Sequence, residues 1–212
     1  MFKGKPIDLT LTLHHGQRGV TFETARTLVK DGWNARTLHL YSHCGTHMDA
    51  PLHFGVSDRT IETYPLTAFM GEAWVVRIPG DCTRKLLKVA DLGRTEALLE
   101  KGDSLLLQTG WSKFVMQDKY RDAMPRISEE LANWCVDRGV KILGVEPPSV
   151  ADVHDLDEVT TIHRILLSAD IMIVEGLTNL DLIQGEKVYF MALPLKVADG
   201  DGAPVRAIAF EL

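Results

Sequence analysis

Four side chains of the kind that bind transition metals lie close together in the first quarter of the chain. His43, His47, Asp49 and His53 fall within eleven residues, and the whole chain has only eight histidines. Imidazole and carboxylate groups together suit zinc, manganese or iron better than calcium or magnesium. One histidine alone would be read as a solvated turn residue, but four such side chains in one short segment predict a metal site.

The spacing of these side chains also bears on their local structure. His43 and His47 would share one face of a helix if the segment were helical. Gly45 lies between them and Pro51 follows, and both residue types disfavour a helix interior. The sequence therefore predicts a ligand loop that leaves a strand at 36–41.

A metal site of this kind needs ligands from elsewhere in the chain, and His163 and Glu175 are the candidates. Glu175 ends an apolar run at 171–174, so its carboxylate is expected near the core, where it requires a metal or another partner. An ion pair with Arg164 is the alternative that the sequence leaves open. His154 lies in an acidic run that we expect to be a solvated loop.

Hydrophobic periodicity predicts the elements that must position these residues. Alternation or short apolar runs predict strands at 7–13, 36–41, 73–78, 104–108, 140–145, 170–175, 186–193 and 205–210. Helical spacing predicts a helix at 89–100 and another between Ser128, a good N-cap, and Gly139. This mixture predicts one α/β domain that covers residues 1–212.

Three features are less regular. Residues 22–33 fit either a short helix that ends at Gly32 or a flap. His39 falls on the polar side of its strand, so we expect it to be exposed rather than a ligand. Residues 199–202 have the aspartate and glycine residues typical of calcium-binding loops, but they lack the full spacing of such a loop. This favours a simple turn.

Composition limits the class of protein. The chain has 212 residues, 45% hydrophobic and 25% charged, which suits a globular protein with one substantial core. Its net charge of −6 gives no electrostatic basis for binding nucleic acid. No apolar run of about 18 residues suggests a membrane span, and the first residues lack the apolar stretch of a signal peptide.

The cysteines indicate the redox environment. Cys44, Cys82 and Cys135 are an odd number and form no CxxC pair. We therefore expect no disulfide framework and a cytoplasmic protein. Cys44 directly follows His43 but does not fit the spacing of the expected ligands. We therefore expect Cys44 to be a small packing residue.

The ligand segment resembles a known family signature. The pattern His43-x-Gly-Thr-His47-x-Asp49-x-Pro-x-His53 is similar to that of the metal-dependent cyclase family. That family includes bacterial kynurenine formamidases (arylformamidases), isatin hydrolase and other amide- or lactone-opening hydrolases. The resemblance covers nearly the whole chain, continuing through 144–149, His163 with 175–177, 192–196 and 203–207.

This resemblance implies a β/β/α (swivelling-domain) fold with a mixed sheet core that assembles into homodimers or homotetramers. It also implies one or two divalent metal ions per chain, zinc or manganese. His43, His47 and Asp49 would hold one ion, and Asp49 would bridge to a second. His163 and Glu175 would hold that second ion.

By the same resemblance, His53 is the catalytic acid/base of a hydrolase that acts on a small molecule. Histidine suits this role because its unperturbed pKa lies near neutrality. A metal beside it would polarise a carbonyl and activate water. The alternative for His53 is a residue that only orients a metal ligand.

The reaction expected from this resemblance is hydrolysis of the C–N bond of a small amide of the N-formylkynurenine type. Residues 14–35 depart from the formamidase pattern, because 14–19 stand where formamidases carry a Trp-Pro-Gly-Asp-like segment. Ring opening of a cyclic amide, imide or lactone is therefore an alternative, and a metal-binding protein without turnover is the non-enzyme alternative. The aromatic pocket residues expected to distinguish the two enzymes are Phe22, Trp33, Phe54 and Trp74.

Overall fold

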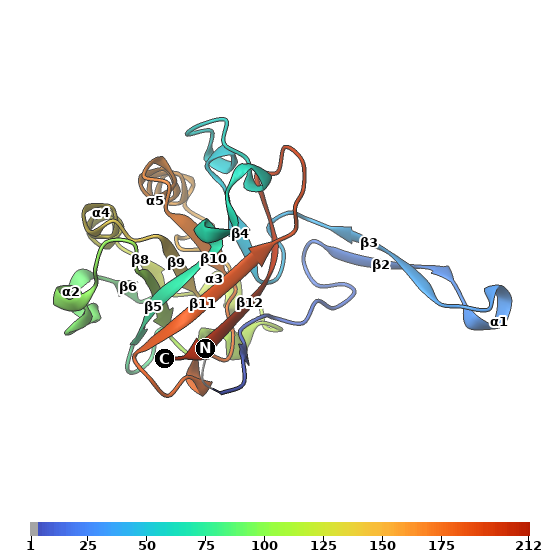
Figure 1. Ribbon diagram of the computed structural model, residues 1–212, viewed down its shortest axis with the longest axis horizontal. Helices are drawn as coiled ribbons and strands as arrows, with labels where there is room; N and C mark the ends of the chain where they lie inside the picture. Colours follow the sequence, from blue (N-terminus) through green and yellow to red (C-terminus); the bar gives the residue numbers. More distant parts are fainter. Residues whose placement is uncertain (1–3) are drawn as a thin grey trace.

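The computed structural model describes residues 4–212, and its centre is a barrel built from one mixed β-sheet (Figure 1). The strands of this sheet are β1 Ile7–Asp8, β4 His47–Asp49, β5 Met70–Arg77, β7 Ser104–Gln108, β9 Ile142–Val145, β10 Met172–Glu175, β11 Lys187–Pro194 and β12 Gly202–Glu211. Two separate strand pairs are β2 Val20–Arg26 with β3 Ala35–Leu40, and β6 Leu86–Leu87 with β8 Arg126–Ile127.

The barrel closes through its last strand. The strand order is β1-β12-β11-β5-β7-β9-β10-β4, and β12 pairs with β4 as well. Strands β5, β7, β9 and β10 are parallel to one another, whereas β4, β11 and β12 pair antiparallel with their neighbours. Closure gives the short strand β4 a partner on both sides, so it offers no free edge.

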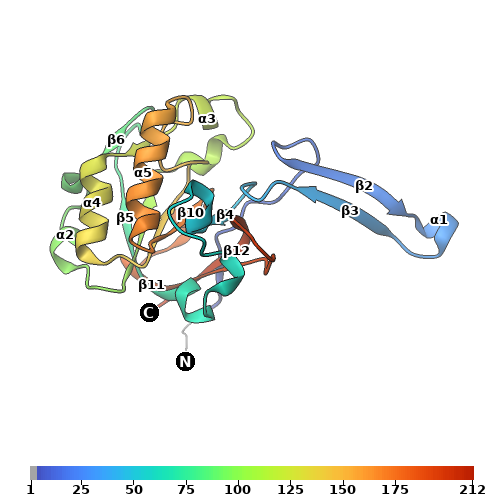
Figure 2. The same ribbon diagram turned by 90° about the horizontal axis from the view of Figure 1, so that it is seen from above.

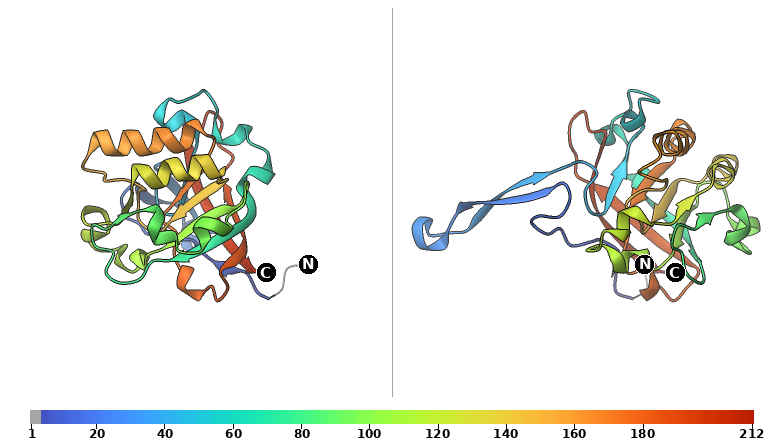
Figure 3. Two further views of the ribbon diagram at one scale, coloured as in Figure 1. Left: turned by 90° about the vertical axis from the view of Figure 1, so that its left-hand side faces the viewer. Right: turned by 180° about the vertical axis from the view of Figure 1, so that it is seen from behind.

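Five α-helices occur among residues 4–212. They are α1 Leu28–Asp31, α2 Thr95–Leu98, α3 Lys119–Asp122, α4 Glu129–Arg138 and α5 Leu156–Ser168. Helices α4 and α5 lie side by side along one side of the barrel (Figures 2 and 3). The short 3-10 helices are η1 Pro51–Phe54, η2 Ile61–Thr63, η3 Leu66–Phe69, η4 Val89–Leu92, η5 Trp111–Phe114 and η6 Leu180–Leu182.

Alternate strand residues face two apolar cores. Leu106 of β7 packs inside the barrel with Met172 and Phe190. Its neighbours Leu105 and Leu107 pack in the other core, which lies between the strands and helices α4 and α5. A strand buried on both faces has a nearly continuous apolar sequence, which is why 104–108 is readable as a strand.

The predicted mixed α/β class is confirmed, and several elements agree closely. The strand predicted at 104–108 is β7, and the helix predicted between Ser128 and Gly139 is α4. The Ser128 side chain accepts a hydrogen bond from the Leu131 backbone N–H, and Gly139 ends the helix in the left-handed conformation. These caps satisfy backbone groups that the helix itself cannot.

Two predicted elements are shorter than expected. In 7–13 only Ile7–Asp8 forms a ladder, although Thr10 makes one bridge to Leu177. The buried Leu9 and Leu11 alternate with threonines that are less buried. The helix predicted at 89–100 is wrong as a single element. Gly93, with φ of +55°, divides it into η4 and α2.

The acidic run around His154 was expected to be a solvated loop, and this is wrong for its second half. Asp155 is the N-cap of α5, and its side chain accepts hydrogen bonds from the N–H groups of Asp157 and Glu158. Those two acidic residues form the first turn, where carboxylates interact favourably with the helix dipole.

Residues 20–40 form a projecting hairpin, which we call the arm. Strands β2 and β3 extend away from the barrel, with α1 at the tip (Figure 1). Both alternatives for 22–33 are thus incomplete, because the short helix that ends at Gly32 lies at the end of a flap-like ribbon. Val29 and Trp33 near the tip are 96% and 57% exposed.

Helices that cross membranes are long and apolar. None of the helices in residues 4–212 meets both conditions.

Candidate metal centre

Two neighbouring strands supply the first part of the site. Strand β4 pairs antiparallel with β10, which places His47 opposite Glu175 and Asp49 opposite Ile173. Because side chains alternate along a strand, His47 and Asp49 share one face while Met48 between them enters the barrel core. The predicted ligand loop is therefore wrong for His47 and Asp49, which lie on a strand.

Strand β4 cannot be predicted from the sequence because its three residues are too few to show an alternation of apolar and polar side chains. Its place in the barrel depends on pairing with β10 and β12, which lie far along the chain. The flanking Gly45 and Pro51 correctly exclude a helix, but they do not exclude a short strand.

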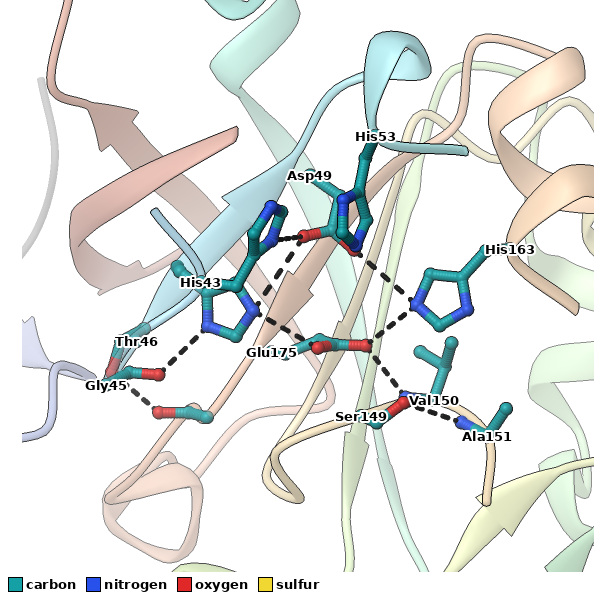
Figure 4. Close-up of polar contacts among 12 residues, drawn as sticks. His43, Gly45, Thr46, Asp49, His53, Ser149, Val150, Ala151, His163 and Glu175 are labelled. Atoms are coloured by element: carbon teal, nitrogen blue, oxygen red, sulfur yellow. Dashed lines mark hydrogen bonds and ion pairs between the residues drawn. The ribbon is translucent and has the colours of Figure 1, made fainter. Parts of the chain in front are cut away.

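Helix α5 supplies His163 over the same face. His163 belongs to the buried side of the helix, together with Ile162, Leu166 and Leu167. Its Nε2 lies 3.4 Å from Glu175 Oε1 and 3.6 Å from Asp49 Oδ2. Figure 4 shows the ring facing both carboxylates.

Two histidines and two carboxylates thus meet in a buried cluster. His47 Nε2 lies 3.2 Å from Glu175 Oε2 and 3.8 Å from Asp49 Oδ1. His43, in the turn before β4, places its Nδ1 2.7 Å from Asp49 Oδ1. Ligand atoms of His43, His47 and Asp49 lie within 4.8 Å of one another, as do those of Asp49, His163 and Glu175. Asp49 belongs to both groups.

One oxygen in this cluster has no hydrogen-bond partner within residues 4–212, although His163 Nε2 lies 3.6 Å away. Asp49 Oδ2 is buried and, among the described residues, forms no hydrogen bond. A buried carboxylate oxygen without a partner is costly, and this one faces His163 and Glu175. The donor set of imidazoles and carboxylates, with one unsatisfied oxygen at its centre, fits a divalent transition metal.

Electrostatic interactions within the cluster lower the pKa of the carboxyl groups and raise the pKa of the histidines. Burial opposes ionisation of Asp49, but the hydrogen bond from His43 and the charges of the three histidines outweigh it and lower its pKa. Burial also opposes charge on His43, yet the Asp49 and Asp201 carboxylates raise its pKa to about 9. Burial is likewise outweighed at His163, where Glu175 raises the pKa.

The backbone holds the outer nitrogens of two histidines. His47 Nδ1 is 3.1 Å from the Gly45 carbonyl, and His163 Nδ1 is 2.7 Å from the Val159 carbonyl. A donated proton there leaves each Nε2 free to face the carboxylate cluster. Glu175 is also fixed, because its Oε1 accepts the Val150 N–H at 2.8 Å (Figure 4).

Close backbone packing supports this geometry. Gly176, directly after Glu175, has φ of +68°, and a Cβ there would come within 2.4 Å of the Gly45 carbonyl oxygen. The Thr46 hydroxyl donates to the Gly176 carbonyl at 2.6 Å. The turn that carries His43 and leads into β4 is thus joined directly to the end of β10.

His53 lies beside the cluster on η1. Its ring stacks on that of His43, with centroids 3.7 Å apart and planes inclined by 25°. Burial lowers the pKa of His53, and with the charges of His43 and His163 it outweighs the opposing carboxylates of Asp49 and Asp201. A lowered pKa favours the neutral imidazole, the form that can accept a proton.

A cavity of about 600 Å³ opens onto the cluster. Its walls include Tyr120 and Arg121 near α3 and the loop at 16–18 before the arm. His53 and Phe54 also line it. This volume matches that of small-molecule sites.

Several other predicted residues lie elsewhere. His39 is exposed and faces Glu23 across the arm at 3.2 Å, as expected. His154 pairs with Asp122 at 3.0 Å and belongs to none of the ligand groups found in residues 4–212. Arg164 is exposed, so the alternative ion pair with Glu175 is wrong.

Of the four predicted aromatic pocket residues, only Phe54 lines the cavity. Phe22 and Trp33 belong to the arm, and Trp74 donates a hydrogen bond to Asp103 at 3.0 Å. Sequence analysis also overlooked Asp201, whose Oδ2 lies 2.9 Å from His43 Nε2. The acidic turn at 199–202 was the available signal, and it was read only as a turn.

Fold and site together define a class of protein, a closed mixed barrel with a histidine–carboxylate centre between a strand pair and a helix. The Cyclase family model, described as "Putative cyclase", matches residues 7–152. The chain is 34% identical over 181 residues to the kynurenine formamidase of Erythrobacter litoralis, covering 84% of this chain and 78% of that protein. It is 30% identical over 188 residues to that of Salinibacter ruber, covering 89% and 85%. The chain belongs to this cyclase family.

Solved structures show the same fold. Isatin hydrolase A from Ralstonia solanacearum superposes with a TM-score of 0.83 at 23% identity, covering 98% of this chain and 92% of that one. Isatin hydrolase A from Labrenzia aggregata, bound to benzyl benzoate, gives 0.86 at 21% identity, covering 98% and 93%.

Proposed function

We propose that this chain is a metal-dependent amidohydrolase that cleaves the C–N bond of a small amide, arylformamidase-like with an N-formylkynurenine-type substrate. The observation that carries the proposal is the buried oxygen of Asp49, which forms no hydrogen bond in the described part of the chain and belongs to the residue that two groups of potential ligands share. A cavity of small-molecule size with a histidine in its wall adjoins them. Similarity to two kynurenine formamidases supports the same reaction.

The proposed cofactor is one or two divalent cations, zinc or manganese. His43, His47 and Asp49 would hold one, and Asp49, His163 and Glu175 the other. A divalent cation bound there supplies Lewis acidity, which polarises the substrate carbonyl and makes water more acidic.

His53 then has the proton-transfer role. As a neutral imidazole at the cavity wall, it takes a proton from the attacking water as the water oxygen bonds to the carbonyl carbon. When the C–N bond breaks, His53 returns that proton to the leaving nitrogen. The products are a carboxylic acid, which ionises, and a free amine.

Ring opening of a cyclic amide, imide or lactone is the second candidate. The loop at 16–18 lines the cavity, and it belongs to the segment that departs from the formamidase pattern. A different wall opposite the same metal centre would accept a different substrate shape. The isatin hydrolases share the fold, which accommodates either reaction.

The test is elemental analysis of the purified protein, paired with hydrolysis assays before and after chelation. The substrates are formanilides, including N-formylkynurenine, and isatin-like rings. We expect one or two metal ions per chain and hydrolysis that chelation abolishes and zinc or manganese restores.

The outcomes separate the candidates. A preference for formanilides supports the first reaction, and a preference for rings supports the second. Metal without turnover on either set would favour a metal-binding protein that is not an enzyme. No metal after loading would contradict the whole proposal.

We also propose that the chain forms a homodimer or homotetramer, with no nucleic-acid or membrane partner. The arm supports self-association, because an isolated two-stranded ribbon is marginal in water and this one exposes Leu28, Val29, Trp33 and Leu38. We propose that a second copy of the chain covers these apolar side chains.

A cytoplasmic location is proposed as well. Cys44, Cys82 and Cys135 are all free and buried, which suits a reducing compartment.

A further inference from the structure

A turn far along the sequence brings a third carboxylate against the histidines of the site. Asp201 lies between β11 and β12, and its Oδ2 is 2.9 Å from His43 Nε2 and 3.5 Å from His53 Nδ1. Ligand atoms of these three residues lie within 4.8 Å of one another, and His43 joins them to Asp49 at 2.7 Å. One carboxylate oxygen thus contacts both a proposed metal ligand and the proposed proton-transfer residue.

The contact completes a pattern among the three proposed histidine ligands. Each directs one nitrogen toward the Asp49–Glu175 cluster and the other outward. The outward nitrogens of His47 and His163 meet backbone carbonyls. The outward nitrogen of His43 meets the Asp201 carboxylate instead. His43 is therefore the only one of these three whose outward nitrogen meets a carboxylate.

The backbone around Asp201 is built against the site. The Ala50 N–H donates to the Asp201 carbonyl at 2.9 Å, and the Ile61 N–H donates to the Gly200 carbonyl at 2.9 Å. Gly202 pairs with Asp49 across β12 and β4. A Cβ on Gly202 would lie 2.7 Å from His43 Cε1, so only glycine allows this close approach. These contacts hold the turn in place without help from the Asp201 side chain.

We propose that Asp201 is a positioning residue that fixes the ring of His43. By accepting the proton on Nε2, it holds the ring with Nδ1 facing Asp49, so that Nδ1 is the nitrogen that would bind a cation in place of its proton. It also fixes the plane on which the His53 ring stacks. This role rests on the metal-dependent hydrolysis proposed above, and it explains why an acidic turn adjoins an already acidic site.

The experiment compares Asp201→Asn with Asp199→Asn. Both changes remove one negative charge from the same turn with nearly unchanged side-chain volume. Asp199 has φ of +54°, a conformation that asparagine also adopts. Its backbone N–H donates a hydrogen bond to Glu62 Oε1 at 2.9 Å, and this bond does not involve the Asp199 side chain. Asp199 is therefore a matched control that does not touch His43.

Metal affinity is measured by competition with a chromophoric chelator, and the visible spectrum is recorded after loading with cobalt(II). For Asp201→Asn we expect the affinity for one ion to fall by about 10- to 100-fold, the range found when such supporting carboxylates are removed. The cobalt spectrum should change, because the ligand ring is reoriented. Asp199→Asn should match the wild type in both measurements.

Steady-state turnover is a second measurement of the role of Asp201. Because Asp201 acts through His43 and His53 rather than on substrate, kcat should fall more than KM changes. Asp201→Ser, whose side chain is too short to reach His43, should show the same losses of metal affinity and kcat. This second variant replaces Asp201→Asn in the test if Asp201→Asn is less stable than the wild type.

Each outcome can be separated from failure of the proposed function. Wild-type affinity and cobalt spectrum in Asp201→Asn and Asp201→Ser would overturn the positioning role, even if hydrolysis is confirmed. Equal losses in the Asp199 control would also overturn it, because the effect would then be general to the turn. Selective loss of one ion supports the role, including in a protein that binds metal but hydrolyses none of the tested amides.

Discussion

At the scale of single residues, the site concentrates charge that the fold alone does not satisfy. Asp49, Glu175, His47 and His163 are nearly fully buried. Burying ions is costly unless each is well paired, and Asp49 Oδ2 is not. A cation at this position would compensate that cost, so these residues are better explained by a ligand than by stability.

The place of Asp49 in two ligand groups leads to the first prediction. Asp49→Asn removes the charge that both ligand groups share, so we expect metal content to fall at both positions. Elemental analysis after dialysis checks this. Asp137→Asn, on the exposed surface of α4, should keep full content. Normal occupancy in Asp49→Asn would show that Asp49 is not a bridge.

The second prediction concerns His53. His53→Ala should keep its metal but lose about 100- to 10,000-fold in kcat, the usual contribution of a positioned acid/base. Steady-state kinetics and metal analysis on one preparation test both parts. His39→Ala, an exposed histidine on the arm, should behave as wild type. Near-normal kcat in His53→Ala would assign it the orienting role instead.

At the scale of elements, the sequence predicts best where local signals and tertiary context agree. Helix α4 has both caps, and β7 is apolar on both faces. Helix α5 is missed because its acidic first turn resembles a solvated loop. Strand β4 is missed because its pairing partners are remote. The ligand types were readable from residues 43–53. Asp201 was visible only as part of an acidic turn, because its place beside His43 depends on the β12–β4 pairing.

The junction between β10 and the turn before β4 gives the third prediction. Gly176→Ala would strain a left-handed backbone and drive its Cβ against the Gly45 carbonyl. We expect the free energy of unfolding to fall by more than about 2 kcal/mol, with weaker metal binding as His47 moves. Denaturant titration and chelator competition measure these effects.

Gly80→Ala is the matched control for that variant. Gly80 has φ of +84° and open space where a Cβ would lie, so only the backbone strain of about 1 kcal/mol should remain. Equal destabilisation of the two variants would mean that the close contact at Gly176 contributes nothing.

At the scale of the whole molecule, the arm is the feature least explained by a single chain. Its strands pair only with each other in the described part of the chain, and few of its residues are buried. Neither periodicity nor burial within one chain specifies such a ribbon, which is why 22–33 stayed ambiguous in sequence.

The fourth prediction follows from the arm. Thr21 pairs with His39, so replacing 22–38 by Asn-Gly should close a short hairpin and leave the barrel intact. We expect sedimentation velocity to show a change from an oligomer to one chain. Val29→Ser with Trp33→Ser should weaken association, while Leu182→Ser, an exposed leucine on the barrel, should not. A wild-type mass near 23.6 kDa would contradict the proposal.

Barrel closure also has a consequence for the order of events in folding. Asp49 and His163 are 114 positions apart in the chain, and they meet only once β4 lies between β10 and β12. Contacts over such separations form slowly, and an open barrel lacks the ligand set that joins Asp49 to His163 and Glu175, although His43, His47 and Asp49 are neighbours in sequence. A cation held by the first of these sets would therefore enter after the slow step, and we expect it to leave the rate of folding unchanged and to reduce the rate of unfolding. It would lengthen the lifetime of the folded chain without guiding its formation.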